Sequence, residues 1–530
     1  MTIVTPVAVF LLIAVGLLYA VIRFWQNRHA LPLPPGPKGI PILGNVNDMP
    51  KPGMLECHHW LQHKELYGPI SSVKAMGQTI IILNDPTIAL DLLRDRSAIY
   101  SSRPSLVFAG DMVGWRHATV MIPYNDVWKI HRKNITKITN TSTSLSVFDR
   151  VQEAEAARLL VNLLESPGRL LEHVRREAGS VILKITYGYN AVPHGKDPLV
   201  VMAEKTMEQF TEATVPGRWA VDIFPFMQYI PDWMPGTGFK RTAKEMAKQL
   251  DQCIAWPYQF VKQQMREKRH TPSFLSQSIE SADSTPEMEF YHKWAALALY
   301  LGGADTTVSA ISTFFLAIHL FPTVQSKAQQ EIDSLTQGLR LPTLADLPNL
   351  PYISAIVQET HRWHLVAPMG IPHTSTREDE YRGYRIPKGS VLLANNWGFM
   401  HDPAVYRDPM AFRPERFIAT EGRDAEPEPR THVFGYGRRI CPGRQVADHA
   451  LFVTIAQTLA VFNVSPSVDS NGRVKRSEVK FEPGTISRPV PFECRITPRS
   501  DAHIELIQEA GQRFAYEESD AQELENVKWQ

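Results

Sequence analysis

The most constraining feature of the chain is an apolar stretch near its centre. Between Lys293 and His319 lie 25 residues with a single charge, Asp305. As an α-helix this stretch would be about 37 Å long, which is enough to cross a bilayer or to run through the core of a large domain. Its middle reads GGADTT, residues 302–307. An aspartate and two threonines are costly at a bilayer midplane, so we predict a long buried helix over 291–321.

The GGADTT segment also carries candidate chemistry. Two glycines within a helix cost about 1 kcal/mol each, so their presence calls for a reason. We expect Gly302 and Gly303 to leave room for a flat group against the backbone. Asp305 and Thr306 would then place an acid and a hydroxyl beside that gap, an arrangement suited to proton transfer.

Composition excludes several functional classes. The 530 residues are 44% hydrophobic and 21% charged, with a net charge of +1. Neither that charge nor any dense basic stripe predicts nucleic-acid binding. The four cysteines are widely spaced and form no C-x-x-C pair, which argues against a disulfide framework and favours a reducing compartment.

The N-terminus predicts a membrane anchor. Residues 3–22 form an uncharged run of 20 residues, just long enough to span a bilayer as a helix. No Lys or Arg precedes the run, whereas Arg23 and Arg28 follow it. The positive-inside rule then puts the rest of the chain in the cytoplasm. We divide the chain into an anchor over 1–30 and a proline-rich hinge over 31–53.

The remainder, residues 54–500, is predicted to be one mainly α domain with small β-sheets, followed by an acidic tail over 501–530. Two alternating, β-branched segments, 70–85 and 381–396, predict hairpins, and the polar stretch 270–287 predicts a surface connection. Helical periodicity covers the segments 149–166, 170–189, 197–215, 239–268, 291–321, 323–337 and 351–364.

A second candidate site surrounds Cys441 in FGYGRRICPGR, residues 434–444. A lone cysteine is often a buried core thiol, and half of a disulfide is another possibility. A third is a thiolate presented to a metal, because glycines allow turns that aim N–H groups at the sulfur and nearby arginines stabilise its charge. Phe434 could shield the sulfur from water. A shielded thiolate of this kind is what a heme iron requires on its proximal side.

These motifs resemble a known family. The loop fits the F-x-x-G-x-R-x-C-x-G pattern of cytochrome P450 monooxygenases. GGADTT resembles the oxygen-activating segment of their central helix, and ETHR (359–362), FRPERF (412–417) and WKIHR (128–132) resemble three further family motifs in the family's order. The resemblance spans roughly residues 32 to 498 and is greatest to microsomal fungal members of secondary metabolism, including the group resembling O-methylsterigmatocystin oxidoreductases. It implies the cytochrome P450 fold behind a single N-terminal transmembrane helix.

The resemblance also implies roles for individual residues. Cys441 would be the thiolate ligand of the iron of heme b, and Asp305 and Thr306 would deliver protons. Glu359, Arg362 and Arg416 would form a buried network that supports the heme loop. His373 stands where many relatives carry arginine, and its charge could depend on pH. The full set of predicted cofactor-binding residues is Trp128, Arg132, Gly303, His373, Phe434, Gly437, Arg439, Cys441 and Gly443.

The implied activity is insertion of one oxygen atom of O2 into a hydrophobic small molecule. Electrons would come from NADPH through the flavins of a separate NADPH–cytochrome P450 reductase, for which Arg438 and Arg444 could form a docking surface. The protein would be a monomer in the endoplasmic reticulum membrane. A heme-thiolate isomerase or dehydratase and a non-enzymatic heme binder or membrane scaffold are the alternatives.

Residues from four segments are the candidates for the substrate pocket, and most of them are apolar, as in sites for hydrophobic ligands. They are the segment 104–123, the helix residues Ala298, Tyr300 and Leu301, the residues Val366, Ala367 and Met369, and the loop residues Thr485 and Ile486.

Overall fold

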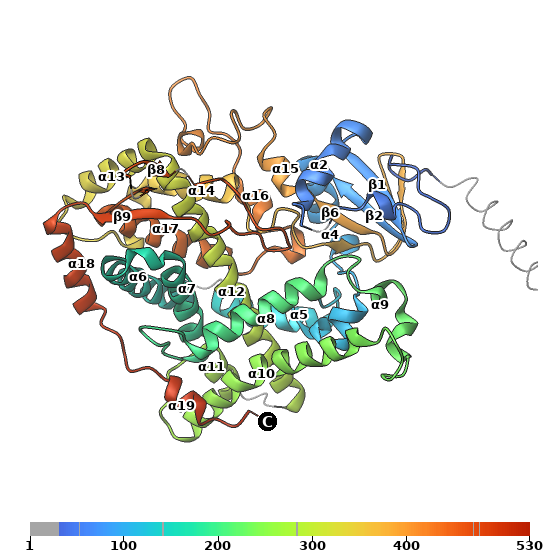
Figure 1. Ribbon diagram of the computed structural model, residues 1–530, viewed down its shortest axis with the longest axis horizontal. Helices are drawn as coiled ribbons and strands as arrows, with labels where there is room; N and C mark the ends of the chain where they lie inside the picture. Colours follow the sequence, from blue (N-terminus) through green and yellow to red (C-terminus); the bar gives the residue numbers. More distant parts are fainter. Residues whose placement is uncertain are drawn as a thin grey trace, which may run out of the picture.

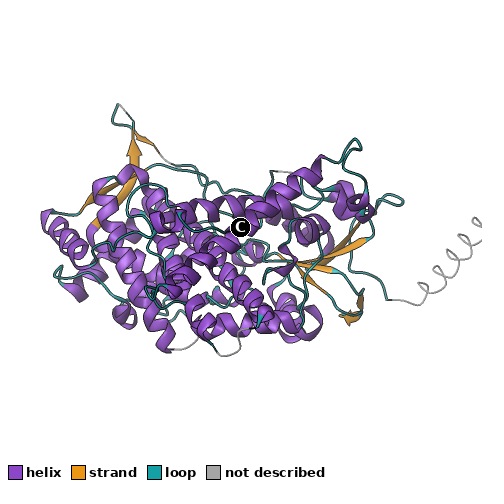
Figure 2. Cartoon of the chain, turned by 90° about the horizontal axis from the view of Figure 1, so that it is seen from below, coloured by secondary structure: helices purple, strands orange, loops and turns teal. Residues whose placement is uncertain are grey.

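The computed structural model describes residues 31–51, 53–139, 142–281, 285–469, 471–475 and 477–529. The predicted membrane anchor, residues 3–22, lies outside the described residues and stays a prediction. Helices form the bulk of the molecule, and small sheets lie toward its two ends (Figures 1 and 2). The prediction of a mainly α domain with small β-sheets is therefore confirmed.

The helices vary from one turn to more than nine turns. In chain order they are α2 Glu56–Tyr67, α3 Pro86–Ala89, α4 Ser97–Tyr100, α5 Asp126–Thr139, α6 Ser142–Glu165, α7 Leu170–Tyr187, α8 Pro198–Thr214, α9 Ala220–Ile223, α10 Gly238–Arg266, α11 Phe274–Glu280, α12 Pro286–Leu320, α13 Pro322–Thr336, α14 Pro351–Trp363, α15 Asn396–Met400, α16 Arg430–Val433, α17 Arg444–Val461, α18 Asp501–Arg513 and α19 Ala521–Glu525.

Helix α12 is the predicted long helix, and it runs through the middle of the molecule (Figure 1). It begins where Thr285 accepts a hydrogen bond from the Met288 N–H and Pro286 occupies the first turn, an arrangement that satisfies a free amide and presets the backbone angle. Among the described residues it is the one helix long and apolar enough to span a membrane, yet most of its apolar stretch is buried within the protein. The prediction of a core helix is confirmed.

The other predicted helices are confirmed with small changes at their ends, and they correspond to α6, α7, α8, α10, α13 and α14. Capping residues in the sequence explain where several of these helices begin or end. Asp197 accepts hydrogen bonds from the Leu199 and Val200 N–H groups at the start of α8, and α7 ends at Gly188, whose φ is 69°. The predicted surface connection 270–287 contains the short helix α11, which a capping box at Ser273 starts.

Three sheets accompany the helices. The strands are β1 Ile70–Ala75, β2 Gln78–Leu83, β3 His373–Thr374, β4 Asp379–Tyr381, β5 Tyr384–Ile386, β6 Val391–Ala394, β7 Phe462–Val468, β8 Val474–Lys475 and β9 Cys494–Pro498. The sheet orders are β1-β2-β6-β3, β4-β5 and β8-β7-β9. The hairpin predicted over 70–85 is confirmed as β1 and β2.

The prediction of a single hairpin over 381–396 is wrong. Strand β5 pairs antiparallel with β4, which precedes it in the chain. Strand β6 belongs to a different sheet, where it pairs in parallel with β2. The alternating pattern identified the strands correctly. It could not identify their partners, because Leu392 of β6 pairs with Ile81, which is far away in the sequence.

Both flanking segments of the described chain pack against the body. The proline-rich segment follows β1, where the Ser72 N–H donates to the Pro35 carbonyl at 2.8 Å. The acidic tail runs from α18, beside α6, to α19, which contacts α10 (Figure 1). The Trp256 indole N–H donates to the Leu524 carbonyl at 2.9 Å, and the Leu524 side chain is fully buried.

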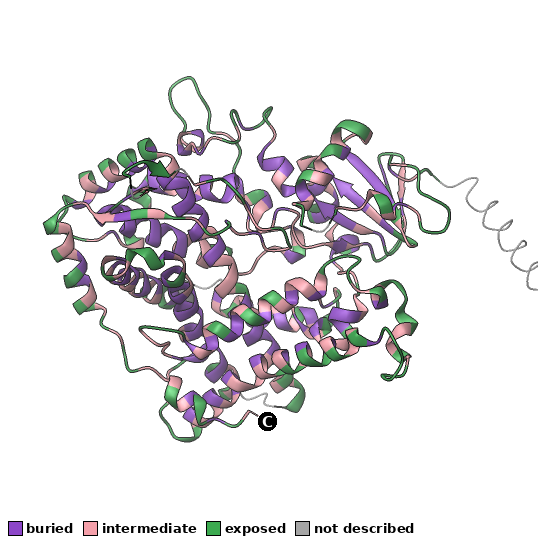
Figure 3. Ribbon diagram, in the orientation of Figure 1, coloured by how far each residue is buried: buried purple, intermediate pink, exposed green. Residues whose placement is uncertain are grey.

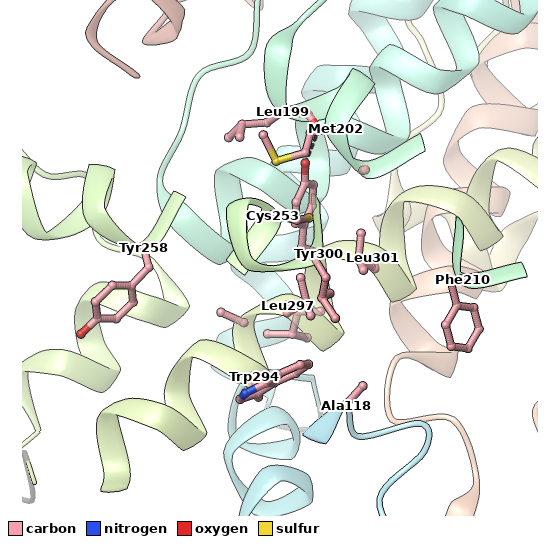
Figure 4. Close-up of a cluster of buried hydrophobic side chains, with 14 of the residues drawn as sticks. Ala118, Leu199, Met202, Phe210, Cys253, Tyr258, Trp294, Leu297, Tyr300 and Leu301 are labelled. Carbon is pink, nitrogen blue, oxygen red and sulfur yellow. Dashed lines mark hydrogen bonds between the residues drawn. The ribbon is translucent and has the colours of Figure 1, made fainter. Parts of the chain in front are cut away.

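One of the two major apolar clusters joins α8, α10 and α12, and buried residues gather along the facing sides of the interior helices (Figure 3). In Figure 4 the Tyr300 hydroxyl of α12 reaches toward α8, where it donates to the Leu199 carbonyl, and Cys253 of α10 lies beside it. Tyr300 is fully buried. A side chain without accessible surface cannot line a cavity, so the prediction that Tyr300 borders the substrate pocket is wrong.

Candidate active site

Cys441 lies in a tight loop between a short 3₁₀ turn, Gly437–Arg439, and the start of α17. Its N–H donates to the Phe434 carbonyl at 2.8 Å. Gly437 has a φ of 50°, and a Cβ at this position would lie 2.6 Å from the Leu93 carbonyl oxygen. Glycine is therefore required there by both backbone angle and space. Gly443 shows neither constraint: its φ is −90° and a Cβ would meet nothing within 4 Å.

The thiol of Cys441 is free, as are those of the other three cysteines, so the disulfide interpretation is excluded. Burial raises the pKa of Cys441 above its ordinary value, while the Gly443 N–H, Arg132 and Arg444 lower it and Asp448 raises it. A buried thiol of this kind becomes a thiolate when a cation binds it, because metal binding displaces the proton. The donor chemistry therefore fits a metal-bound group.

A cluster of basic residues adjoins this loop, in which Arg439 and His373 are buried and Arg103 and Arg132 are partly buried. The Arg439 guanidinium donates to the Ser101 carbonyl at 2.7 Å, to the Thr119 carbonyl at 3.2 Å and to the Ile122 carbonyl. It also stacks over the Trp128 ring at 4.6 Å. Burial, and next the charge of Arg132, lower the pKa of Arg439 to about 9.

Arg103 and His373 complete the cluster. Arg103 donates to the Ile371 carbonyl at 2.8 Å and the Pro372 carbonyl at 2.7 Å, and His373 Nδ1 lies 2.6 Å from the Tyr100 carbonyl. Burial lowers the pKa of Arg103, and the charge of Arg439 lowers it further. Burial also lowers the pKa of His373, and the charge of Arg103 lowers it further.

The partners of this cluster reveal its chemistry. Within the described ranges, the side-chain hydrogen bonds of Arg103, Arg132, Arg439 and His373 all go to backbone carbonyls, and no ion pair joins these residues to a carboxylate. Buried guanidinium groups without a counter-charge are costly. The cluster is therefore built for an anion, and the two propionates of a heme fit its charge and its position beside Cys441.

Sequence reasoning brought out Trp128, Arg132, His373 and Arg439, but it missed Arg103. The signal was present in SSRP, residues 101–104, where an arginine stands at the edge of an apolar segment without a nearby acid. Arg132 donates to the Ile440 carbonyl at 2.5 Å, next to Cys441. Its contact with a propionate stays a prediction.

On α12 the two adjacent glycines face different ways. A Cβ at Gly302 would meet nothing within 4 Å, whereas a Cβ at Gly303 would lie 2.8 Å from the Ile182 side chain of α7. Successive residues are 100° apart around a helix, so one glycine opens a gap and the other allows close helix packing. The expected gap for a flat ligand therefore exists at Gly302 and not at Gly303, whose predicted cofactor contact stays a prediction.

Asp305 and Thr306 follow these glycines. The Thr306 hydroxyl donates to the Gly302 carbonyl at 2.6 Å, which aligns it with the open face of the helix. Asp305 Oδ1 lies 3.4 Å from Arg488 Nη1. Burial raises the pKa of Asp305, and the charges of Arg488 and Arg175 oppose that rise. Sequence reasoning missed Arg488, because it lies on a distant loop and forms no motif with Asp305.

Glu359, Arg362 and Arg416 form a fully buried ion network. Arg362 Nε lies 2.7 Å from Glu359 Oε2, and Arg416 Nε lies 3.0 Å from the same oxygen. Glu426 adds a contact at 2.5 Å with Arg416. The structure thus brings the three predicted residues together and adds a fourth, for which the sequence offered no signal.

Comparison with known proteins agrees with this geometry. The cytochrome P450 family model matches residues 34–491. Cytochrome P450 monooxygenase ppsD of Aspergillus oryzae is 43% identical over 500 residues, which cover 94% of each chain. Cytochrome P450 monooxygenase claR of Ampulloclitocybe clavipes is 42% identical over 516 residues, covering 97% of this chain and 95% of the relative. O-methylsterigmatocystin oxidoreductase of Aspergillus flavus is 38% identical over 497 residues, 93% of each chain.

The chain belongs to the cytochrome P450 family. It is a monooxygenase of that family, whose members bind heme b through a cysteine thiolate. The predicted family resemblance is confirmed.

Proposed function

We propose that the protein inserts one atom of O2 into a hydrophobic intermediate of fungal secondary-metabolite biosynthesis, with electrons that NADPH supplies through a separate reductase. The observation that carries the proposal is that Arg439, which is buried, and Arg103, which is partly buried, lie without a carboxylate partner among the described residues beside the free thiol of Cys441. Two chemically distinct requirements of a heme, a thiolate for its iron and cations for its propionates, are met within one region.

In this proposal the Cys441 thiolate would bind the heme iron, and Gly437 and Phe434 hold its loop. When bound, the heme supplies the iron at which O2 is activated. Trp128 keeps the Arg439 guanidinium in place by stacking, and Arg132 fixes the backbone at Ile440. The network of Glu359, Arg362, Arg416 and Glu426 makes no contact with substrate and maintains the loop's position.

Asp305 and Thr306 are proposed to move protons. The Thr306 hydroxyl stands at the helix face opened by Gly302, and Asp305 lies next to it within reach of Arg488. Burial raises the pKa of the Asp305 carboxyl group, and the charges of Arg488 and Arg175 oppose that rise. A carboxyl group within reach of a hydroxyl is suited to proton transfer. Asp305 would pass protons to Thr306, which would hand them to the oxygen site.

The substrate class rests on apolar candidates for the pocket wall and on the relatives. Several of these candidates keep accessible surface beside the buried core, among them Val107, Met112 and Ala298. Apolar walls favour hydrophobic ligands. One relative carries the name O-methylsterigmatocystin oxidoreductase.

Electrons are proposed to arrive on the side of the Cys441 loop. There a surface hollow of about 440 Å³ is lined by Arg94, Arg430 and Arg444, with a single acid, Glu428, which pairs with Arg430 at 3.1 Å. Arg438 is exposed as well, with its guanidinium stacked over Tyr124 at 4.9 Å. Such a cationic face would attract the acidic face of NADPH–cytochrome P450 reductase and speed its association.

Membrane attachment is proposed to involve the body as well as residues 3–22. Trp233, Tyr229 and Phe226 are 81%, 80% and 65% exposed, and Ile42 is 96% exposed. The segment after α9 and the β1–β2 sheet lie toward the same end of the molecule (Figure 1). Exposed aromatic residues of this kind suit a membrane interface. We propose a monomer held on the cytoplasmic face of the endoplasmic reticulum.

The first test is the CO difference spectrum of the reduced full-length protein and of Cys441→Ala. A strongly red-shifted Soret band in the wild type alone is expected. Folded wild-type protein that binds no heme would overturn the proposal. Consumption of NADPH and O2 with a reductase and a substrate panel then separates oxygen insertion from isomerisation or dehydration, which consume neither.

A further inference from the structure

Three polar residues, two of them charged, form an array on the proximal side of the Cys441 loop. His361 Nε2 of α14 lies 3.0 Å from Asp448 Oδ1 of α17, and Arg430 Nε of α16 lies 2.9 Å from Asp448 Oδ2. The exposed fractions of these side chains rise from 6% for His361 to 21% for Asp448 and 29% for Arg430. The array therefore runs from the interior to the surface, where Arg430 borders the basic hollow.

The inner end of the array touches the cysteine loop. The His361 ring packs edge-on against the Phe434 ring, with centroids 5.1 Å apart. The Phe434 carbonyl in turn accepts the hydrogen bond from the Cys441 N–H. His361 thus packs against Phe434, the residue whose carbonyl binds the backbone N–H of Cys441.

The charge of the array also reaches the sulfur. Burial works to raise the pKa of Asp448, but His361 and Arg430 outweigh it and the net pKa lies below its ordinary value, so Asp448 is a carboxylate at neutral pH. Its negative charge acts on the Cys441 thiol in the direction opposite to Arg132 and Arg444. Charges separated by protein rather than water interact strongly, and groups behind a metal ligand tune the metal it binds.

We propose that His361, Asp448 and Arg430 act together as a proximal array that sets the electrostatic potential at the Cys441 thiolate and thereby the reduction potential of the iron. The inference rests on the proposed heme-thiolate function. Asp448 supplies a fixed negative charge that resists reduction, and Arg430 and His361 partly neutralise it. These are positioning residues, since none of them contacts the iron or the substrate.

The sign of the change in reduction potential distinguishes an electrostatic role of the array from a purely mechanical one. Asp448→Asn removes the negative charge, so the iron should be easier to reduce and its potential should rise. Arg430→Gln removes a neutralising charge, so the potential should fall. A loop that is merely loosened would shift in the same direction in both variants. The double variant Arg430→Gln/Asp448→Asn should return close to the wild-type potential.

The experiment is a redox titration of the full-length, heme-loaded protein with mediators, which needs no reductase, followed at the Soret band. Asp149→Asn is a matched control, because Asp149 pairs with His449, the neighbour of Asp448, at 2.7 Å and is not among the charges that act on Cys441. Its potential should equal that of the wild type. Arg430 is partly exposed, so Arg430→Gln keeps the test decisive even where Asp448→Asn fails to fold.

Opposite shifts in the two single variants, with cancellation in the double variant and none in the control, support the array. Equal potentials in wild type and Arg430→Gln, or shifts of the same sign, overturn it while the CO spectrum still reports a thiolate-bound heme. A wild type without that spectrum overturns the proposed function and the array together.

Discussion

Replacing Glu177 with glutamine should stabilise the protein at alkaline pH and much less at acidic pH. Glu177 is buried on α7, where the Thr454 hydroxyl of α17 donates to its Oε1. Its Oε2 has no hydrogen-bond partner, and neither does Oε1 of Gln152 nearby. Both residues border a cavity of about 30 Å³ between α6, α7, α12 and α17, which is large enough for one water molecule.

This environment favours the neutral acid. Burial raises the pKa of Glu177 from 4.5 to about 8, the Thr454 hydroxyl lowers it and Glu155 raises it. Because the folded pKa lies above the unfolded one, the stabilisation is complete below pH 4.5 and is lost as the pH rises through 8. At about 1.4 kcal/mol per pH unit, the loss reaches about 4 kcal/mol at pH 8. Glutamine is neutral at every pH and avoids this loss.

The assay is urea unfolding of the full-length protein, followed by tryptophan fluorescence at pH 5.5 and pH 8.5. The free energy of unfolding of Glu177→Gln relative to wild type should rise by about 3 kcal/mol between these two pH values. Glu509→Gln, which changes an exposed side chain on α18, should show no such rise. Parallel pH dependences for wild type and Glu177→Gln would refute the reasoning.

Three further changes have defined outcomes. Glu359→Gln leaves Arg362 and Arg416 buried without their shared counter-charge, so the free energy of unfolding should fall by about 3–5 kcal/mol; an unchanged urea midpoint would contradict the network's role. Thr306→Ala should increase H2O2 release relative to NADPH consumed while Thr306→Ser does so less, and wild-type coupling in both would argue against the proton route. Leu524→Ala empties a fully buried site in the acidic tail and should lower the free energy of unfolding by about 3 kcal/mol; no loss in calorimetry would mean that the tail adds no stability.

Local features of the fold were predictable because their causes are local. The 3.6-residue periodicity over 149–364 identified seven helices, although α5, α17 and α18 outside that range were not predicted. The alternation in 70–85 identified a hairpin whose strands are neighbours in sequence. The pairing of β6 with β2 was not predictable, since it depends on how two distant segments meet. The short helix α11 was missed because its polar composition resembles that of a connecting loop.

The residues of the candidate site likewise include some that the sequence could predict and others that it could not. Cys441 and its glycines, and Asp305 with Thr306, stand in short contiguous motifs that the sequence displays. Arg103 and Arg488 act through partners far away in the chain, and no spacing rule connects them to those partners. The choice between Gly302 and Gly303 also required the structure, because only the position of α7 shows which face is open.

The sequence by itself determined the family, the central helix and the identity of the thiolate candidate, because residue types at short fixed spacings encode turns, helix faces and a ligand. The tertiary structure alone decided which cations lie in the interior without a carboxylate partner within the described residues, as at Arg103 and Arg439, and which acids are held neutral or ionised, as at Glu177 and Asp448. The physical reason is that the energy of a charge depends on the groups and the solvent around it, and folding brings those groups together from remote parts of the chain.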